Sequence, residues 1–182
     1  MVDNIDYFFQ TLVKSYMYAD IECMMEKGLN FSIAPLLASW TEIIGSVYKE
    51  NIGSKGKSRE NYNTFLKKMG YSEVIEEFNN KFGNEPYDII RCGLIHQYII
   101  KKKANIHSNL DDCKKGIYLK EDEIVICNRK YFEDFKKAID NVISEINGDS
   151  EKRGRINNRL GGINLAQTSG EVVFSSGKEI SL

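Results

Sequence analysis

The chain has 182 residues, a formal net charge of −1 and 42% hydrophobic residues. This length suits one domain with one substantial core. The charge excludes a globally basic nucleic-acid-binding protein, although local basic clusters remain possible. No stretch approaches the roughly 18 consecutive apolar residues of a membrane span, and the N-terminus has no secretory pattern. We therefore expect a cytoplasmic protein with no membrane partner.

Four cysteines are spread along the chain, at Cys23, Cys92, Cys113 and Cys127. They have no C-x-x-C spacing, and three lie in apolar surroundings. Reduced thiols are therefore favoured over a disulfide framework or a zinc site. The sequence contains no clustered set of Asp, His and Cys ligands, so it predicts no metal site and no cofactor.

The first two predicted helices follow apolar residues at helical spacing. One is expected at about residues 4–27, ended by Gly28. The second has its apolar stripe over residues 33–47, with Ser32 as the expected cap and Pro35 in the first turn. These two helices would form the beginning of a helical bundle.

A polar linker follows at residues 51–58, and its segment Gly53-Ser-Lys-Gly-Lys-Ser58 superficially suggests a phosphate loop. The pattern G-x-x-x-x-G-K-[ST] requires glycine where this chain has Asn51. It also requires a strand before the loop, where we expect a helix. A flexible linker is therefore favoured over a nucleotide site.

Helical spacing resumes after the linker. Apolar residues at 62–78 predict one or two helices interrupted near Gly70, and Pro86 then opens a helix expected to reach Ile100. The last strong helix is expected at about residues 129–146. The helices together predict a mainly α, antiparallel helical bundle.

The periodicity changes before that last helix. β-Branched runs at residues 117–119 and 124–127 flank the polar turn at 120–123, which predicts a small β-hairpin inserted at about residues 105–127. We expect His107 to lie exposed in a loop.

The end of the chain has a different composition. We expect a helical domain over residues 1–147 and a polar, extended C-terminal tail over residues 148–182. Within this tail, residues 172–174 (Val-Val-Phe) are expected to pair as a strand or to lie along a partner chain.

Arg91 and His96 interrupt the otherwise apolar run of residues 87–100. Burying a guanidinium or an imidazole is costly unless each group finds a partner. Structural explanations are an intrahelical pair of Arg91 with Asp88 and a core His96 bonded to a backbone carbonyl. Residues five apart diverge by about 140° on a straight helix, so we expect a second helix or a second copy to complete any site.

The segment Arg91-Cys-Gly-Leu-Ile-His96 resembles the R-x4-6-H signature of HEPN domains, helical bundles that include many metal-independent prokaryotic RNases. With Tyr98 it is similar to the R-x4-H-x-Y form of HEPN toxins encoded beside nucleotidyltransferase-like antitoxins. The resemblance implies a bundle over roughly residues 4–146 and a homodimer. Gly93 would let the second backbone approach closely. It also implies that a cognate antitoxin modifies Tyr98.

The implied chemistry is intramolecular transesterification of RNA. His96 would accept the 2′-OH proton as general base, and Arg91 would hold the charge that builds up on the scissile phosphate. The products would be a 2′,3′-cyclic phosphate and a 5′-hydroxyl, with no work assigned to a metal. Lys101, Lys102 and Lys103 are expected either to contact the RNA backbone or to form a solvated helix end.

Cys92 departs from the family pattern, in which Asn, Asp or His usually follows the arginine. The leading interpretation is a HEPN-like metal-independent ribonuclease, of toxin or phage-defence type, in which Arg91 and His96 are catalytic and Cys92 and Tyr98 line the substrate site. The alternative is a catalytically inactive HEPN-type module that binds RNA, a nucleotide or a protein partner. A third interpretation is a helical interaction protein in which Asp88 and Arg91 merely pair.

Overall fold

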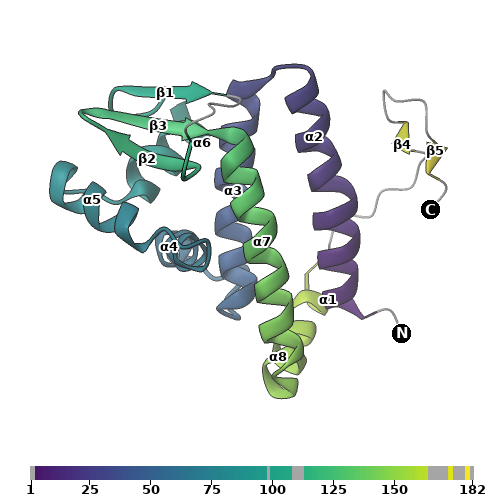
Figure 1. The fold of residues 1–182 in the computed structure, drawn as a ribbon. Helices are drawn as coiled ribbons and strands as arrows, with labels where there is room; N and C mark the ends of the chain where they lie inside the picture. The colour runs from purple at the N-terminus through teal and green to yellow at the C-terminus, as the bar shows by residue number, and fades with distance from the viewer. Residues whose placement is uncertain (1–2, 98, 108–112, 164–171, 174–178, 181–182) are drawn as a thin grey trace.

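The computed structural model describes residues 3–97, 99–107, 113–163, 172–173 and 179–180. The chain is mainly helical, with a small three-stranded sheet at one end of the helices (Figure 1). The prediction of a mainly α protein with a small β insertion is thus confirmed. In the described residues, no helix combines the length and the apolar character needed to cross a membrane.

The N-terminal helix is continuous through α1 (Asn4–Asp6), the π-helical segment η1 (Tyr7–Met17) and α2 (Tyr18–Glu26). Its most regular buried stripe recurs at every fourth residue, namely Ile5, Phe9, Val13, Met17 and Ile21. In a regular α-helix, steps of four residues drift by about 40° each. The wider turn of the π-helical segment keeps this stripe facing the core. Gly28, with φ of +68°, follows the helix as predicted.

Helix α3 (Asn30–Tyr48) is the central helix, and it packs against α2, α4, α7, the helix that contains Arg91, and β1. It begins three residues earlier than predicted, because the Leu29 carbonyl accepts hydrogen bonds from the N–H groups of Ser32 (3.0 Å) and Ile33 (3.2 Å). Ser32 is therefore inside the helix and not its cap. Pro35 lies in the second turn instead of the first.

The segment after the linker forms two helices, α4 (Ser58–Lys68) and α5 (Ser72–Phe82). Gly70, with φ of +83°, separates them at the predicted position. Helix α4 approaches α3 closely at Gly45, where an added Cβ atom would lie 1.9 Å from the Asn61 carbonyl oxygen. Glycine at this position therefore sets the spacing between the two helices.

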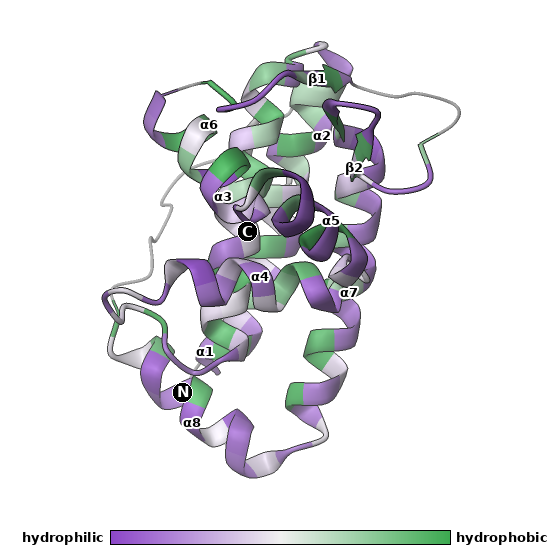
Figure 2. Cartoon of the chain, turned by 90° about the vertical axis from the view of Figure 1, so that its left-hand side faces the viewer, coloured by the Kyte–Doolittle hydropathy of each residue, from purple (hydrophilic) through white to green (hydrophobic). Residues whose placement is uncertain are grey.

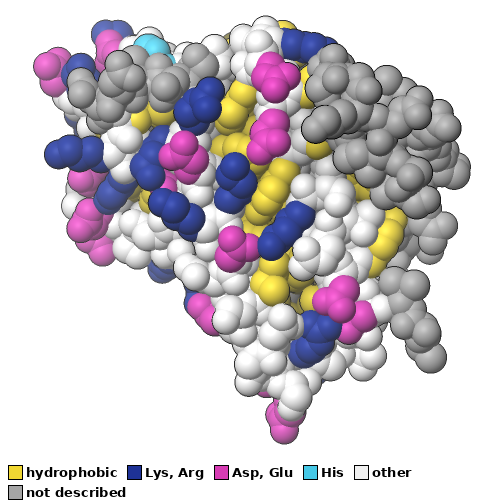
Figure 3. All heavy atoms as spheres, turned by 45° about the vertical axis from the view of Figure 1, so that its right-hand side comes forward, with side chains coloured by type: hydrophobic (Ala, Val, Ile, Leu, Met, Phe, Trp, Pro, Cys, Tyr) yellow, Lys and Arg dark blue, Asp and Glu magenta, His cyan; other side chains and the backbone are white. Residues whose placement is uncertain are grey.

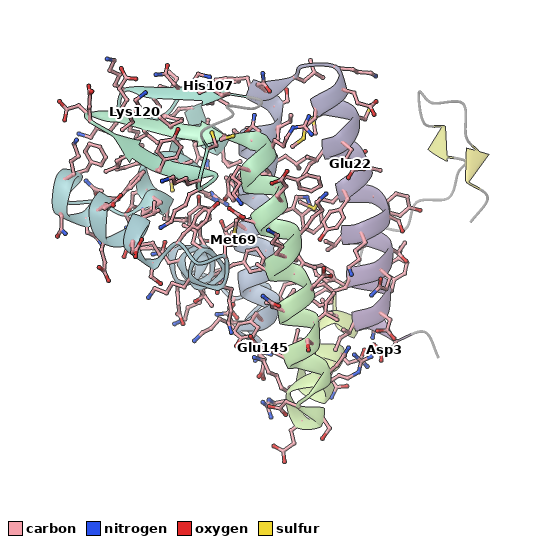
Figure 4. The ribbon with its side chains drawn as sticks, in the orientation of Figure 1. Asp3, Glu22, Met69, His107, Lys120 and Glu145 are labelled. Carbon is pink, nitrogen blue, oxygen red and sulfur yellow. The ribbon has the colours of Figure 1, made fainter. Side chains whose placement is uncertain are left out.

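The sheet has the strand order β1-β3-β2. Strands β2 (Ile117–Lys120) and β3 (Glu123–Cys127) are antiparallel, which confirms the predicted hairpin. Strand β1 (Ala104–His107) pairs in parallel with β3 along its other edge. The expectation that His107 lies in a loop is wrong, because His107 belongs to β1 and pairs with Cys127 (Figure 4).

Helix α7 (Asn128–Asn147) confirms the last predicted helix. The chain then forms α8 (Ser150–Gly161) in a region that was expected to be an extended tail. The Asp149 side chain caps α8 by accepting a hydrogen bond from the Lys152 N–H (2.9 Å), and Ile156 is buried. Hydrophilic and hydrophobic residues alternate along α7 and α8 (Figure 2), as in amphipathic helices. Helix α8 packs against α1 and α7.

Two short strands lie further along the chain, β4 (Val172–Val173) and β5 (Glu179–Ile180). They pair antiparallel with each other. The predicted strand at residues 172–174 is thus present at Val172–Val173, and its strand partner lies within the tail. Its third residue, Phe174, lies outside the described residues.

Positive and negative side chains alternate over the face toward α2 and α7 (Figure 3). Two ion pairs connect the N-terminal helix to α7. They join Lys14 to Asp140 at 2.8 Å and Lys136 to Glu22 at 3.6 Å. Such a mixed face does not have the concentrated positive charge that a nucleic-acid backbone requires.

The close approach of α3 and α4 yields a stability prediction. Gly45→Ala should lower the free energy of unfolding by about 1–3 kcal/mol, because the methyl group would overlap the Asn61 carbonyl. Gly154 in α8 is the matched control, since nothing lies within 4 Å of an added Cβ atom there. Gly154→Ala should stabilise by roughly 0.5–1 kcal/mol through helix propensity. Urea unfolding of both variants measures the difference, and equal effects would contradict the packing described.

Candidate functional site

The helix that contains Arg91 and His96, hereafter the motif helix, consists of the π-helical segment η2 (Tyr87–Arg91) and helix α6 (Cys92–Gln97). Pro86 precedes its first residue, as predicted. The helix ends at Gln97 and does not reach Ile100 as expected. It packs against α3, the central helix, and its first segment also contacts α4.

Gly93 explains this early end. The Ile99 N–H donates a hydrogen bond to the Gly93 carbonyl (3.2 Å), so the chain folds back over the last turn. An added Cβ atom at Gly93 would lie 2.3 Å from the Ile99 carbonyl oxygen. Gly93 does admit a close backbone, but that backbone is the chain's own and not the partner backbone that was expected.

Arg91 pairs with Glu42 of α3. The Arg91 Nε lies 2.5 Å from the Glu42 Oε2, and the two side chains are only 17% and 16% exposed. The contact is an ion pair whose two atoms lack the alignment of a hydrogen bond. The Arg91 Cζ also lies 5.7 Å from the centre of the Tyr87 ring. Electrostatic pairing and ring contact together fix the guanidinium at the surface of α3.

Asp88 does not form the intrahelical pair with Arg91 that was considered. Its Oδ1 accepts a hydrogen bond from the Arg59 Nη2 of α4 at 2.8 Å. Arg59 also lies 3.9 Å from Glu85. Asp88 therefore ties the motif helix to α4, while Arg91 ties it to α3.

His96 meets Arg91 within one chain. Its Nε2 lies 3.3 Å from the Arg91 Nη1, and the imidazole is exposed. The expectation that these residues need a second helix or copy to meet is wrong for this contact, because the long arginine side chain spans the angular separation. A guanidinium only donates hydrogen bonds, so the His96 Nε2 must accept. This contact requires the tautomer of His96 in which the nitrogen nearest Arg91 carries no proton.

Cys92 lies beside Tyr87 on the first turn of α6. Burial, followed by interaction with Cys92, raises the pKa of Tyr87, while the Ser58 hydroxyl and the Arg91 charge lower it. The Tyr87 ring in turn contacts the buried Tyr62, with 5.9 Å between the ring centres. Cys92 therefore touches the ring that supports Arg91.

Two of the three lysines expected near the site, Lys102 and Lys103, contact other elements. Lys102 lies over the Phe82 ring at 5.6 Å, and Lys103 pairs with Glu123 of β3. Lys101 is exposed, and the described part of the chain gives it no ion-pair partner. The side-chain contacts of Lys102 and Lys103 are therefore with α5 and the sheet, while the Lys101 N–H donates to the Ile89 carbonyl of the motif helix (3.5 Å). Tyr98, the predicted modification site, lies outside the described residues.

Glu42 was not among the residues expected at the site. The signal was present in the sequence, because Glu42 is the only Asp, Glu, Lys or Arg between Asn30 and Tyr48. A lone carboxylate in one apolar helix and a lone guanidinium in another are natural partners, since neither can be buried alone without large cost. The site is therefore a chain of three side chains, from Glu42 through Arg91 to His96.

No protein-family model, no curated protein and no solved structure matches this chain. The described residues also contain no group of three or more His, Cys, Asp or Glu side chains placed to hold a metal ion. The functional inference therefore rests on the geometry of the site.

The contact between Arg91 and His96 predicts the protonation of the ring. We expect the neutral imidazole of His96 to carry its proton on Nδ1, because Arg91 donates to Nε2. The 15N chemical shifts of the ring nitrogens measure this directly. Arg91→Gln should remove the preference, and His107, on β1, serves as an internal comparison. Unchanged His96 shifts in the variant would contradict the contact.

Proposed function

We propose that this chain is a HEPN-like, metal-independent ribonuclease that acts as a homodimer, in the toxin or phage-defence setting that the sequence motif implies. The observation that carries the proposal is the pairing of an oriented Arg91 with an exposed His96 whose Nε2 accepts. A general base needs a free lone pair that a substrate can reach. A phosphate-binding arginine needs a fixed orientation. In the free protein Arg91 occupies the Nε2 lone pair of His96, so the proposal includes a shift of the Arg91 Nη1 to the RNA phosphate, which frees this lone pair for the 2′-OH.

The proposed reaction has two proton transfers and replaces the bond from phosphorus to the 5′-oxygen by a bond to the 2′-oxygen. The His96 Nε2 takes the proton of the ribose 2′-OH, and the 2′-oxygen attacks the adjacent phosphorus. Arg91 donates to the phosphate oxygens as charge builds up. The bond to the 5′-oxygen then breaks, and this oxygen takes a proton from water or from an acid of the second protomer. The products are a 2′,3′-cyclic phosphate and a 5′-hydroxyl.

An exposed apolar surface supports the dimer. Ile99 is 63% exposed and Phe31 is 50% exposed, and both line a surface hollow of about 410 Å³ together with Ile100 and Ile106. Exposed apolar side chains that gather at one place are typical of interaction surfaces. Because Ile99 follows His96 by three residues, a second copy bound here would bring a second Arg91–His96 pair close to the first.

The alternative is a catalytically inactive HEPN-type module that binds RNA, a nucleotide or a protein. Cys92 favours this alternative, because it replaces the polar residue that usually follows the arginine in the family. A module of this kind would keep the Arg91 charge for binding and would leave His96 without a catalytic task.

The ribonuclease proposal predicts that His96→Ala and Arg91→Ala each lower RNA cleavage at least about a hundredfold, the scale expected for a lost general base or charge donor. Arg91→Lys keeps the charge beside Glu42 but loses the planar fork, so its cleavage should also fall. Cys92→Asn should keep or raise the rate. Cleavage of labelled single-stranded RNA in excess chelator is the measurement, and product analysis should find cyclic phosphate ends.

His107→Ala is the matched control, because His107 is the only other histidine in the chain and lies on β1. It should cleave at the wild-type rate, and circular dichroism should show that every variant is folded. If the wild-type protein leaves diverse RNAs intact and Cys92→Asn does not restore cleavage, the binding module replaces the enzyme.

The dimer is tested separately. We expect light scattering to give twice the chain mass at micromolar concentration, with an interface of at least about 1,000 Å² in total. Ile99→Glu should yield a monomer, because it places a charge in the apolar surface. Lys137→Glu, an exposed change on α7, should leave the dimer intact. A wild-type monomer at these concentrations would refute the dimer.

A further inference from the structure

A second hollow lies next to the Glu42–Arg91 pair. It has a volume of about 490 Å³ and is bounded by the N-terminal helix, α3 and the loop that leads into α4. Glu42 is part of its wall, so the hollow and the Arg91–His96 pair share one carboxylate. Its size falls within the range of small-molecule sites.

One wall of the hollow is aromatic and apolar. Trp40 and Phe8 meet there, with 6.3 Å between the ring centres and 50° between the ring planes. Phe8 is buried and Trp40 is half-buried, so Trp40 offers ring surface to the hollow. A planar aromatic ligand would bury this surface by stacking or edge contact.

Asn61 of α4 also lines the hollow and has a side-chain oxygen that is unpartnered among the described residues. Asn61 is 4% exposed, and its side-chain Oδ1 has no hydrogen-bond partner in the described structure. A buried carbonyl oxygen without a donor is unfavourable, so the Asn61 Oδ1 favours a ligand that donates a hydrogen bond to it. An amide offers a donor and an acceptor side by side, as the edge of a nucleobase also does.

Within the described part of the chain, one unpaired positive charge lies at the hollow. The negative charge of Glu42 is balanced by Arg91, and Lys57 pairs with Glu60 at 3.2 Å. Lys55 lines the hollow and has no ion-pair partner among the described residues. Ser58, the first residue of α4, lines it too, and no side chain caps this helix N-terminus. Free N–H groups beside an unpaired lysine favour a phosphate group.

From these walls we infer that the hollow binds one nucleotide unit, with the base between Trp40 and Asn61 and the phosphate at Lys55 and Ser58. The loop at residues 51–58 is not a Walker loop, because helix α3 precedes it, but it supplies the phosphate side of this site. As a substrate subsite the hollow rests on the ribonuclease proposal and would hold a base near the scissile phosphate. As a nucleotide site it stands without that proposal.

Trp40 is the only tryptophan of the chain, so its fluorescence reports on this hollow alone. We expect saturable changes on titration with AMP, CMP, GMP and UMP, and weaker changes with the matching nucleosides. Short single-stranded oligoribonucleotides are titrated into the His96→Ala variant, which cannot cleave them. Tighter binding of oligonucleotides than of mononucleotides identifies RNA as the source of the nucleotide, and the reverse identifies a free nucleotide.

Lys55→Glu should weaken nucleotide binding about tenfold or more and leave nucleoside binding unchanged, because only the phosphate contacts Lys55. Lys57→Glu is the matched control and should have little effect, since Lys57 does not line the hollow. Asn61→Asp, which replaces a donor by an acceptor, should alter the order of preference among the four bases. Lys55 is exposed, so its variant remains informative even if Asn61→Asp fails to fold.

The inference is overturned if neither nucleotides nor oligonucleotides change the fluorescence at millimolar concentration. It is also overturned if Lys55→Glu and Lys57→Glu bind alike. Failure of the ribonuclease proposal alone gives a distinct result. The wild-type protein would then show saturable nucleotide binding but would leave RNA intact. Cleavage of RNA without any change in fluorescence would refute nucleotide binding in the hollow and leave the ribonuclease proposal standing.

Discussion

The partly buried ion pair between Glu42 and Arg91 is the constraint on which the site depends. Glu42 is the only charged residue of α3, Arg91 is the only lysine or arginine of the motif helix, and each would be costly to bury alone. Their pairing fixes the motif helix against α3 at one point. It also holds the Nε of the Arg91 guanidinium beside the Glu42 carboxylate. The other end, Nη1, then lies 3.3 Å from His96, so the orientation of the imidazole follows from a contact made on another helix.

The same turn of α3 also positions α4. Gly45 lies three residues after Glu42 and therefore on the same side of the helix, where its missing side chain lets the Asn61 backbone approach. This approach brings Asn61 to the hollow that Glu42 lines. One short stretch of α3 thus pairs with the motif helix through the Glu42 carboxylate and lets α4 approach closely at Gly45. A bulky residue at position 45 would displace Asn61, even though position 45 itself is not part of the hollow.

Local periodicity was enough to predict most of the helices and the β2–β3 hairpin, because their apolar residues repeat at regular intervals. Strand β1 was missed because it has no β-branched run and depends on pairing with β3, about 20 residues later in the chain. Helix α8 was missed because only two of its residues are buried and its composition is polar. Asp149 followed by Ile156 and Leu160 was the available signal, a cap followed by apolar residues four apart.

At the site, the motif residues were predictable but their geometry was not. Helical angles describe where Cβ atoms point, and they separate Arg91 from His96 by about 140°. They do not describe how far an arginine side chain reaches, nor that a carboxylate on another helix directs it. Predicting Glu42 as the partner of Arg91 would have required a different comparison, between charged residues that lie in separate, mainly apolar helices. That comparison uses only the sequence and the cost of burying a charge.

Cys92 stands where the HEPN pattern usually has Asn, Asp or His. Its position in the structure indicates which side chains this difference would affect. Cys92 interacts with the Tyr87 hydroxyl, and the Tyr87 ring lies 5.7 Å from the Arg91 Cζ. A polar residue at position 92 would therefore act on the ring beneath the guanidinium and only through it on His96. The acceptor nitrogen of His96 depends on Arg91, and Arg91 depends on Glu42, so neither contact requires a polar residue at position 92. This separation is why the ribonuclease proposal can retain Arg91 and His96 as its catalytic pair despite Cys92.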